Sequence, residues 1–229
     1  MKTYKSHVVS FRPLSILFML ISLTISATSV IAGTIVGSAH DFSSAGWSGG
    51  DICTACHTPH NSDTTVTQAP LWNHSLTTSN FTMYTSPTLD ASGGGQPGGV
   101  SRLCLSCHDG TVATDSFGGT TGTNFLSGNV AIGAGGKLSD DHPISITYDS
   151  ALSNTDPGLH DPSSTSVTIG QGGDKVRSGT IAELLLSDGM IQCSSCHDVH
   201  NNFTAATGGS PLLKISKTGS ALCLTCHNK

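Results

Sequence analysis

The chain has few of the residues that build an ordinary hydrophobic core or an ordinary charged surface. Aromatic residues make up 5% of its 229 residues and charged residues 11%, while 27 residues are glycine. A typical soluble domain carries about 25% charged residues, so the low fraction hints at self-association, with a solvated surface rich in Ser and Thr as the alternative. Once Lys2, Lys5 and Arg12 are set aside, seven basic residues remain against fifteen acidic ones. This balance excludes a typical nucleic-acid-binding surface.

Every cysteine belongs to one of four C-x-x-C-H motifs, which run from Cys53 to His57, Cys104 to His108, Cys193 to His197 and Cys223 to His227. In this motif the two cysteines form thioether bonds to a haem and the histidine binds its iron. Structural zinc sites and disulfides also use paired cysteines, but neither requires a histidine at that place. Because histidine is about 5% of the chain, four coincidences have a probability of roughly one in 10⁵.

The motifs therefore predict four covalently bound haem c groups. The attachment residues are Cys53, Cys56, Cys104, Cys107, Cys193, Cys196, Cys223 and Cys226, and the proximal iron ligands are His57, His108, His197 and His227.

The amino-terminal segment 1–32 is predicted to be a signal peptide. It has a basic start, an uncharged apolar run from Leu14 to Ile25, and a cleavage-like sequence Val30-Ile31-Ala32. We therefore expect a secreted protein, extracellular or at the cell surface, with the periplasm as the alternative. An uncleaved anchor is the competing interpretation, since the stretch from Pro13 to Ile31 approaches the length that spans a bilayer.

The rest of the chain repeats itself. The pattern C-x-x-C-H-x-x-H-N occurs at Cys53–Asn61 and Cys193–Asn201, and L-C-L-x-C-H occurs at Leu103–His108 and Leu222–His227. Self-similarity of this kind indicates a duplicated unit. The sequence thus predicts a first two-haem module at 33–130 and a second at 131–229.

The fold class expected is mostly irregular, with short α-helices at the haem motifs, a few short strands and a core of haem. Removal of residues 1–32 leaves 197 residues, or about 49 per motif. Strands are predicted within Asp140–Tyr148 and at Ser166–Ile169. A helix is predicted at Ile181–Leu186 with Thr180 as its N-cap, and the lead-in Gly33–Asp51 is expected to be irregular.

The residue on the other side of each iron decides its chemistry: histidine gives a low-potential electron carrier, methionine raises the potential, and an open position permits catalysis. Only Met83 and Met190 lie outside the signal segment, so methionine cannot serve four haems. His60 and His200 each follow a proximal histidine by three residues. On a continuing helix they would share its face, so each would have to ligate a different haem.

Two further distal ligands are suggested by position in the repeat. His40 precedes Asp41 and His142 follows Asp141, each upstream of a C-x-x-C-H-x-x-H-N motif, and carboxylates commonly orient metal-bound imidazoles. The predicted distal set is therefore His40, His60, His142 and His200. His74 is the reserve, and His160 is expected to be a surface residue.

The residues resemble the doubled C-x-x-C-H multihaem cytochromes, and more narrowly the tetrahaem c-type cytochromes that polymerise into extracellular conductive filaments. The resemblance rests on Ala39–Phe42, Cys53–Asn61, Leu71–Asn73, Arg102–Gly110, Ser139–Ile146, Cys193–Asn201 and Ala221–His227. It implies closely stacked bis-histidine haems, no catalytic haem, and an axial histidine that can come from a neighbouring subunit.

Three functions remain open at this point. The first is a filament subunit that carries electrons along its haems, with itself as head-to-tail partner and redox cytochromes or extracellular acceptors beyond. The second is a soluble periplasmic tetrahaem carrier. The third, an enzyme such as a multihaem reductase, needs an open coordination position. Since histidines suffice for all four irons, no enzyme activity and no catalytic residue are predicted.

Overall fold

The computed structural model describes residues 35–170, 175–203 and 212–229. They belong to one compact unit, Ala32–Lys229. The predicted signal peptide, and with it the competing membrane anchor, lies outside the described residues. Within the described ranges, no helix combines the length and the apolar character needed to cross a membrane.

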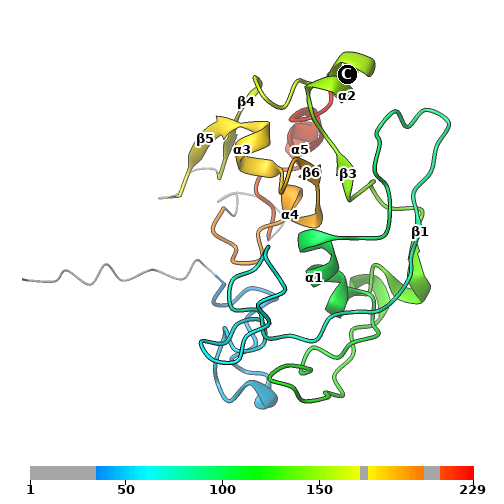
Figure 1. Cartoon of the computed structure of the whole chain (residues 1–229). Helices are drawn as coiled ribbons and strands as arrows, with labels where there is room; N and C mark the ends of the chain where they lie inside the picture. The colour runs from blue at the N-terminus through cyan, green and yellow to red at the C-terminus, as the bar shows by residue number, and fades with distance from the viewer. Residues whose placement is uncertain (1–34, 171–174, 204–211) are drawn as a thin grey trace, which may run out of the picture. The chain divides into compact units, whose positions relative to one another are not determined.

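The secondary structure consists of short elements separated by long irregular stretches (Figure 1). The α-helices are α1 (Gly99–His108), α2 (Ser150–Thr155), α3 (Ile181–Leu185), α4 (Cys193–Cys196) and α5 (Ala221–Leu224). The strands are β1 (Thr82–Met83), β2 (Lys137–Leu138), β3 (Ile146–Thr147), β4 (Ser166–Ile169), β5 (Arg177–Thr180) and β6 (Met190–Ile191). The described residues also contain the 3₁₀ helices η1 (Gly46–Ser48), η2 (Gly128–Val130), η3 (Ala134–Gly136) and η4 (Thr218–Ser220).

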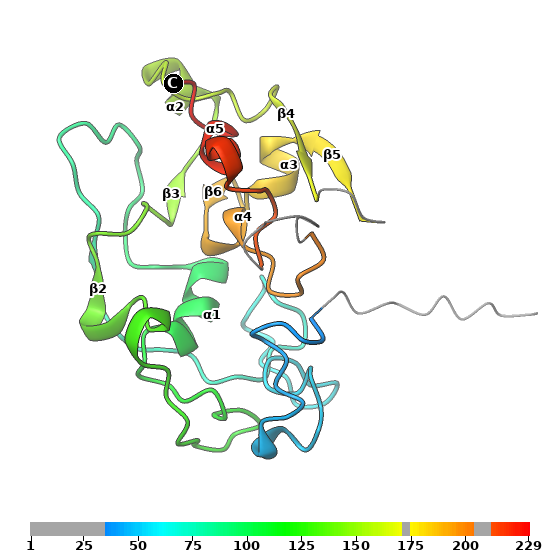
Figure 2. The same cartoon turned by 180° about the vertical axis from the view of Figure 1, so that it is seen from behind.

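The strands form three two-stranded pairs. β1 pairs with β2 in parallel, with Thr82 opposite Lys137. β3 and β6 are antiparallel and lie side by side in both views (Figures 1 and 2). β4 and β5 are also antiparallel, and Ile169 lies opposite Arg177. The carboxyl terminus lies beside α2 in Figure 2, where Asn228 donates its backbone N–H to the carbonyl of Gly158 at 2.8 Å.

Local sequence signals account for two of these elements. The predicted strand Ser166–Ile169 is confirmed as β4. The predicted helix is confirmed as α3, which begins after Thr180. The Thr180 hydroxyl accepts from the backbone N–H of Glu183 at 3.2 Å, and the Glu183 carboxylate accepts from the backbone N–H of Thr180 at 2.8 Å. This reciprocal pair is a capping box.

Two other predictions differ from the structure only in detail. The short strand expected within Asp140–Tyr148 is present as β3, which covers only Ile146–Thr147. It cannot extend backwards, because Ser145 has φ 57°, a left-handed conformation outside the strand region. The lead-in to Asp51 is mostly irregular as expected, but it contains η1.

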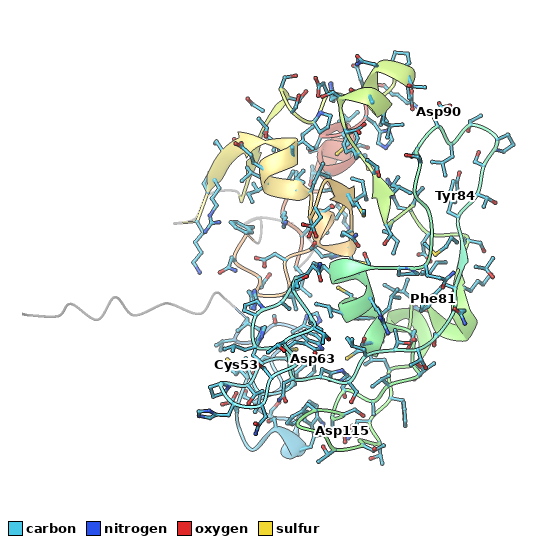
Figure 3. All side chains as sticks on the ribbon, viewed as in Figure 1. Cys53, Asp63, Phe81, Tyr84, Asp90 and Asp115 are labelled. Atoms are coloured by element: carbon cyan, nitrogen blue, oxygen red, sulfur yellow. The ribbon has the colours of Figure 1, made fainter. Side chains whose placement is uncertain are left out.

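Buried apolar side chains gather in three separate clusters. The largest packs around α3 and β4 and consists of Tyr148, Ile169, Ile181, Leu185, Phe203 and Ile215. A second joins Ala69, Trp72 and Leu103. The third joins Phe81, labelled in Figure 3, with Leu105 and Leu138. Residues from both predicted modules therefore share a cluster, and no single core dominates the described chain.

Candidate functional site

Each C-x-x-C-H motif winds into about one helical turn. The motif at Cys104–His108 forms the second half of α1. In the other three motifs the histidine N–H donates to the carbonyl of the first cysteine, at 2.8 Å for His57 and 3.0 Å for both His197 and His227. A single turn places residues three apart on the same side, so the two thiols of a motif face one direction.

The first motif is a turn to which no helix is assigned. Cys53, labelled in Figure 3, begins this turn, and the Asp51 carboxylate caps it by accepting from the backbone N–H of Cys53 at 2.6 Å and of Thr54 at 2.9 Å. The expectation of a short helix at every motif was therefore wrong here, because after the two hydrogen bonds to the Cys53 carbonyl the next N–H, that of Thr58, donates to Leu71 instead.

All eight cysteines are free, so the disulfide alternative does not describe this structure. Within the described residues, no group of three or more His, Cys, Asp or Glu side chains is arranged to hold a metal ion. A haem iron takes four ligands from its porphyrin and needs at most two from the protein. Pairs of histidines are therefore the relevant arrangement.

The thiols of neighbouring motifs lie close to one another. Cys104 and Cys193 share a hydrogen bond, which raises the pKa of Cys104 and lowers that of Cys193. Burial, followed by the charge of Cys56, raises the pKa of Cys107 to about 12. Thiols of the first motif therefore interact with those of the second motif, and thiols of the second motif interact with those of the third.

The fourth motif joins the same series. Burial raises the pKa of Cys196 and, to about 11, that of Cys226. The charge of Cys223 also raises the pKa of Cys196, and the charge of Cys196 also raises the pKa of Cys226. Sulfur neighbours therefore connect the motifs in chain order.

Hydrogen bonds set the ring orientation of the motif histidines. His57 places Nδ1 at 2.8 Å from the carbonyl of Pro70, and His108 places Nδ1 at 2.6 Å from the carbonyl of Val130. A carbonyl oxygen only accepts, so Nδ1 must carry the proton. The lone pair is then on Nε2, the nitrogen available to a metal.

A left-handed leucine supports the first motif. Leu71 has φ 58°, an uncommon conformation for a bulky residue. Its carbonyl accepts from the backbone N–H of Thr58 at 2.9 Å, and Asn73 donates its N–H to the carbonyl of Cys56 at 2.9 Å. The loop 70–73 thereby holds the end of the motif from both sides.

The third motif is supported in the same way. Leu212 has φ 66° and accepts from the N–H of Asp198 at 2.8 Å, while Lys214 donates to the carbonyl of Cys196 at 2.9 Å. Burial is the largest cause that lowers the pKa of His197, and a hydrogen bond with the backbone of Leu212 partly offsets this effect by raising that pKa. Sequence reasoning missed this second half of the repeat, although the Pro-Leu pairs at 70–71 and 211–212 were a readable signal.

The continuing helix expected between each motif histidine and the histidine three residues later is absent. His197 is extended, with φ −103° and ψ 144°. Asn61 and Asn201 are left-handed, with φ 56° and 53°, as Asn tolerates well. The shared-face argument for His60 and His200 was therefore wrong in its geometry, because each chain segment turns away directly after the motif.

Three of the four predicted distal histidines nevertheless lie beside a motif histidine of another segment. The ring-centroid separations are 6.1, 6.2 and 6.3 Å for the pairs His40–His108, His57–His200 and His142–His227. Two imidazoles on opposite sides of one metal, each with an M–N bond of about 2.0 Å, have centroids about 6.3 Å apart. The ring planes meet at 60°, 18° and 72°, and rotation about the metal–nitrogen axis permits any such angle.

Two orphaned polar atoms lie next to these pairs. His40 Nδ1 and Trp72 Nε1 are buried without a hydrogen-bond partner, and Trp72 makes an edge contact with His57 at 6.3 Å. Burial, followed by the charges of His108, His197 and His200, lowers the pKa of His40 to about 4. His40 is therefore neutral, the form that binds a metal. The donor set fits haem groups held between paired imidazoles.

The remaining histidines are placed differently. His60 is exposed, and among the described residues no aromatic ring contact is recorded for it or for His197. His74 is buried, with Nδ1 at 2.8 Å from the carbonyl of Ser75, and with Nε2 at 3.0 Å from the carbonyl of Ala113 and 3.5 Å from Cys107 Sγ. His160 is half-buried and donates its N–H to the carbonyl of Cys226 at 2.9 Å.

No family model matches the chain, and no curated protein is significantly similar to it.

Proposed function

We propose that this protein is a secreted tetrahaem c-type cytochrome that carries electrons along bis-histidine haems, without enzymatic activity. The observation that carries the proposal is the set of three histidine pairs at 6.1–6.3 Å, each joining a C-x-x-C-H histidine to a histidine from elsewhere in the chain. Neither structural zinc sites nor disulfides account for such pairs.

The chain's own residues would hold each haem in three ways. Two cysteines of a motif would supply the thioethers. The motif histidine would present Nε2, and at His57 and His108 a carbonyl holds the Nδ1 proton. A second histidine would close the other side at three of the four motifs. The bound group supplies reversible one-electron exchange. Paired imidazoles leave no open position at the irons of His57, His108 and His227. If His60 of a second chain closes the position opposite His197, none remains for a reductase.

The sulfur contacts support a linear order of haems. The charge of Cys56 raises the pKa of Cys107, the side chain of Cys193 raises that of Cys104, and Cys196 interacts in the same way with Cys223 and Cys226. Because each thioether sulfur would bond to a substituent at the edge of its porphyrin, neighbouring sulfurs would bring neighbouring porphyrin edges together. Electrons would therefore pass between the four motifs in chain order.

The histidine pairing also favours assembly into a filament. His57 in the first copy of the repeat is paired with His200 in the second copy, so the ligand comes from the next copy along. If the same rule continues, His197 takes its ligand from the next chain, where the equivalent residue is the exposed His60. A contact of this head-to-tail kind propagates without limit unless it closes into a ring.

The soluble carrier is the second candidate. It would pair His60 with His197 within one chain. Each copy of the repeat would then supply one histidine to the other copy, and no histidine would be left to bind a second chain. The exposure of His60 disfavours this arrangement.

Haem content tests the central proposal. The purified protein should contain four haems per chain by alkaline pyridine haemochrome assay and by intact mass. The oxidised protein should be low-spin, and the reduced protein should not bind carbon monoxide. A colourless protein would overturn the proposal, and a carbon monoxide complex would favour the reductase.

Electron microscopy tests the assembly. Wild-type protein should form fibres, while His60→Ala should give dispersed particles in which one haem per chain is high-spin. His160→Ala, which removes a half-buried histidine outside the three pairs, is the matched control and should still form fibres. Dispersed wild-type particles with four low-spin haems at every concentration would identify the soluble carrier instead.

A further inference from the structure

A buried cluster of polar side chains joins the second motif to the third. Ser101 on α1 is completely buried, Gln192 at the start of α4 is 4% exposed, and Ser145 before β3 is 9% exposed. Buried polar groups are costly unless they are hydrogen-bonded, so this cluster calls for an account of each group.

Gln192 Oε1 is the common acceptor of the cluster. It accepts from the backbone N–H of Ser101 at 3.3 Å, from the Ser145 hydroxyl at 3.4 Å, and from the Ser101 hydroxyl. The Ser101 oxygen in turn accepts from the backbone N–H of Cys193 at 3.0 Å. Cys193, Ser101 and Gln192 therefore form a chain of hydrogen bonds, in which each bond polarises the next.

The same glutamine also sets the start of α4. Its backbone N–H donates to the Ser195 hydroxyl at 2.9 Å, and its side chain packs beneath Gly99, where an added Cβ would lie 3.5 Å from Nε2. Gly99 has φ 49° and begins α1. The two helices that carry the second and third motifs are thus locked together at their amino-terminal ends (Figure 1).

What this lock holds in place is the contact between two cysteines. Cys193, the first cysteine of the third motif, donates its backbone N–H to the hydroxyl of Ser101, which lies three residues before Cys104, the first cysteine of the second motif. The side chain of Cys193 is also the largest cause that raises the pKa of Cys104. This is one of the places where the two predicted modules, 33–130 and 131–229, meet.

We propose that Gln192 is a positioning residue that sets the contact between the second and third haems, and so the step at which electrons cross between the two halves of the chain. The proposal rests on the proposed haem attachment. Gln192 touches no haem atom in this account; it acts through Ser101 and the backbone of Cys193, which determine where α4 lies against α1.

The test uses the complete holoprotein. Gln192→Leu keeps the approximate volume but removes the acceptor, Gln192→Glu keeps an acceptor oxygen, and Gln68→Leu makes the same change at an exposed glutamine whose recorded partner is Asp188 at 3.5 Å. The readout is the broadening that neighbouring ferric haems impose on each other's low-spin EPR signals in frozen solution. Haem content and spin state are measured on every variant.

Gln192→Leu should retain four low-spin haems but lose part of the inter-haem broadening, while Gln192→Glu and Gln68→Leu keep it. Unchanged broadening in Gln192→Leu would overturn the positioning role. If Gln192→Leu does not accumulate, Ser101→Ala breaks the same hydrogen-bond chain with a smaller change and should show the same loss. Wild-type spectra with no broadening would also overturn it. Absence of haem would instead refute the proposed function, so the two failures are distinguishable.

Discussion

Tyr148 ties the largest apolar cluster to the fourth motif, and its hydroxyl gives a sharp test of the packing. The side chain is 3% exposed. Its hydroxyl donates to the carbonyl of His160 at 2.6 Å and lies 3.3 Å from the carbonyl of Cys226. Since the backbone N–H of His160 also donates to Cys226, a single hydroxyl braces the segment that carries the motif.

The cost of Tyr148→Phe follows from these contacts. The substitution loses a partly buried hydrogen bond and leaves the partly buried carbonyl of His160 without that donor, which together should lower the free energy of unfolding by about 2 kcal/mol. For a protein of this size the melting temperature should fall by about 4–8 °C. The ring is retained, so no cavity contributes.

The effect should depend on pH in a defined direction. Burial is the largest cause that raises the pKa of Tyr148, and neighbouring Cys226 and Asp161 raise it further. A raised pKa in the folded state contributes stability that is complete below the unfolded pKa of about 10 and is lost as the pH rises above it. The difference between wild type and Tyr148→Phe should therefore shrink above about pH 10.

Guanidinium unfolding of the two proteins at pH 7 and pH 11 measures both effects. Tyr84→Phe is the matched control, because Tyr84, labelled in Figure 3, lies after β1 outside the apolar clusters; it should change the midpoint little. If Tyr148→Phe matched this control, the bracing role of the hydroxyl would be refuted.

Three further predictions concern the site and its supports. His200→Ala should leave four haems attached but convert one of them, that of His57, to high spin, seen as a new charge-transfer band; an unchanged spectrum would contradict the pairing. Thr180→Ala should cost about 1 kcal/mol in denaturant unfolding. Hydrogen bonds from Thr180 lower the pKa of Glu183, so the destabilisation by Glu183→Gln should fade as the pH falls below about 4. Leu71→Val should destabilise by about 1 kcal/mol because a branched side chain resists the left-handed conformation, whereas Leu71→Asn should not; equal midpoints would refute the strain.

The sequence predicted those features that depend on neighbouring residues. Thr180 was predicted to cap the helix at Ile181–Leu186, and a strand was predicted at Ser166–Ile169; both are present. The four motifs themselves are also local. The turns after the first and third motifs were missed, although Asn61 and Asn201, residues that favour a left-handed backbone, stood in the right places.

Pairing between distant segments could not be read in the same way. His57 meets His200 across most of the chain, and nothing in the spacing of either residue selects the other. The hydrogen bond between Gln192 and Ser101 could not be predicted either, because in the sequence a glutamine that will be buried does not differ from one that will be exposed. Contacts of this kind depend on packing and loop closure, which local patterns do not encode.

The pairing of His57 with His200 bears on how such a chain could have arisen. An ancestor with one copy of the repeat would have had no second copy to draw on, so the same imidazole would have had to come from a separate polypeptide. Gene duplication and fusion would have placed that imidazole in the same polypeptide for every second pair. A chain of haems of a given length would then need fewer contacts between separate molecules.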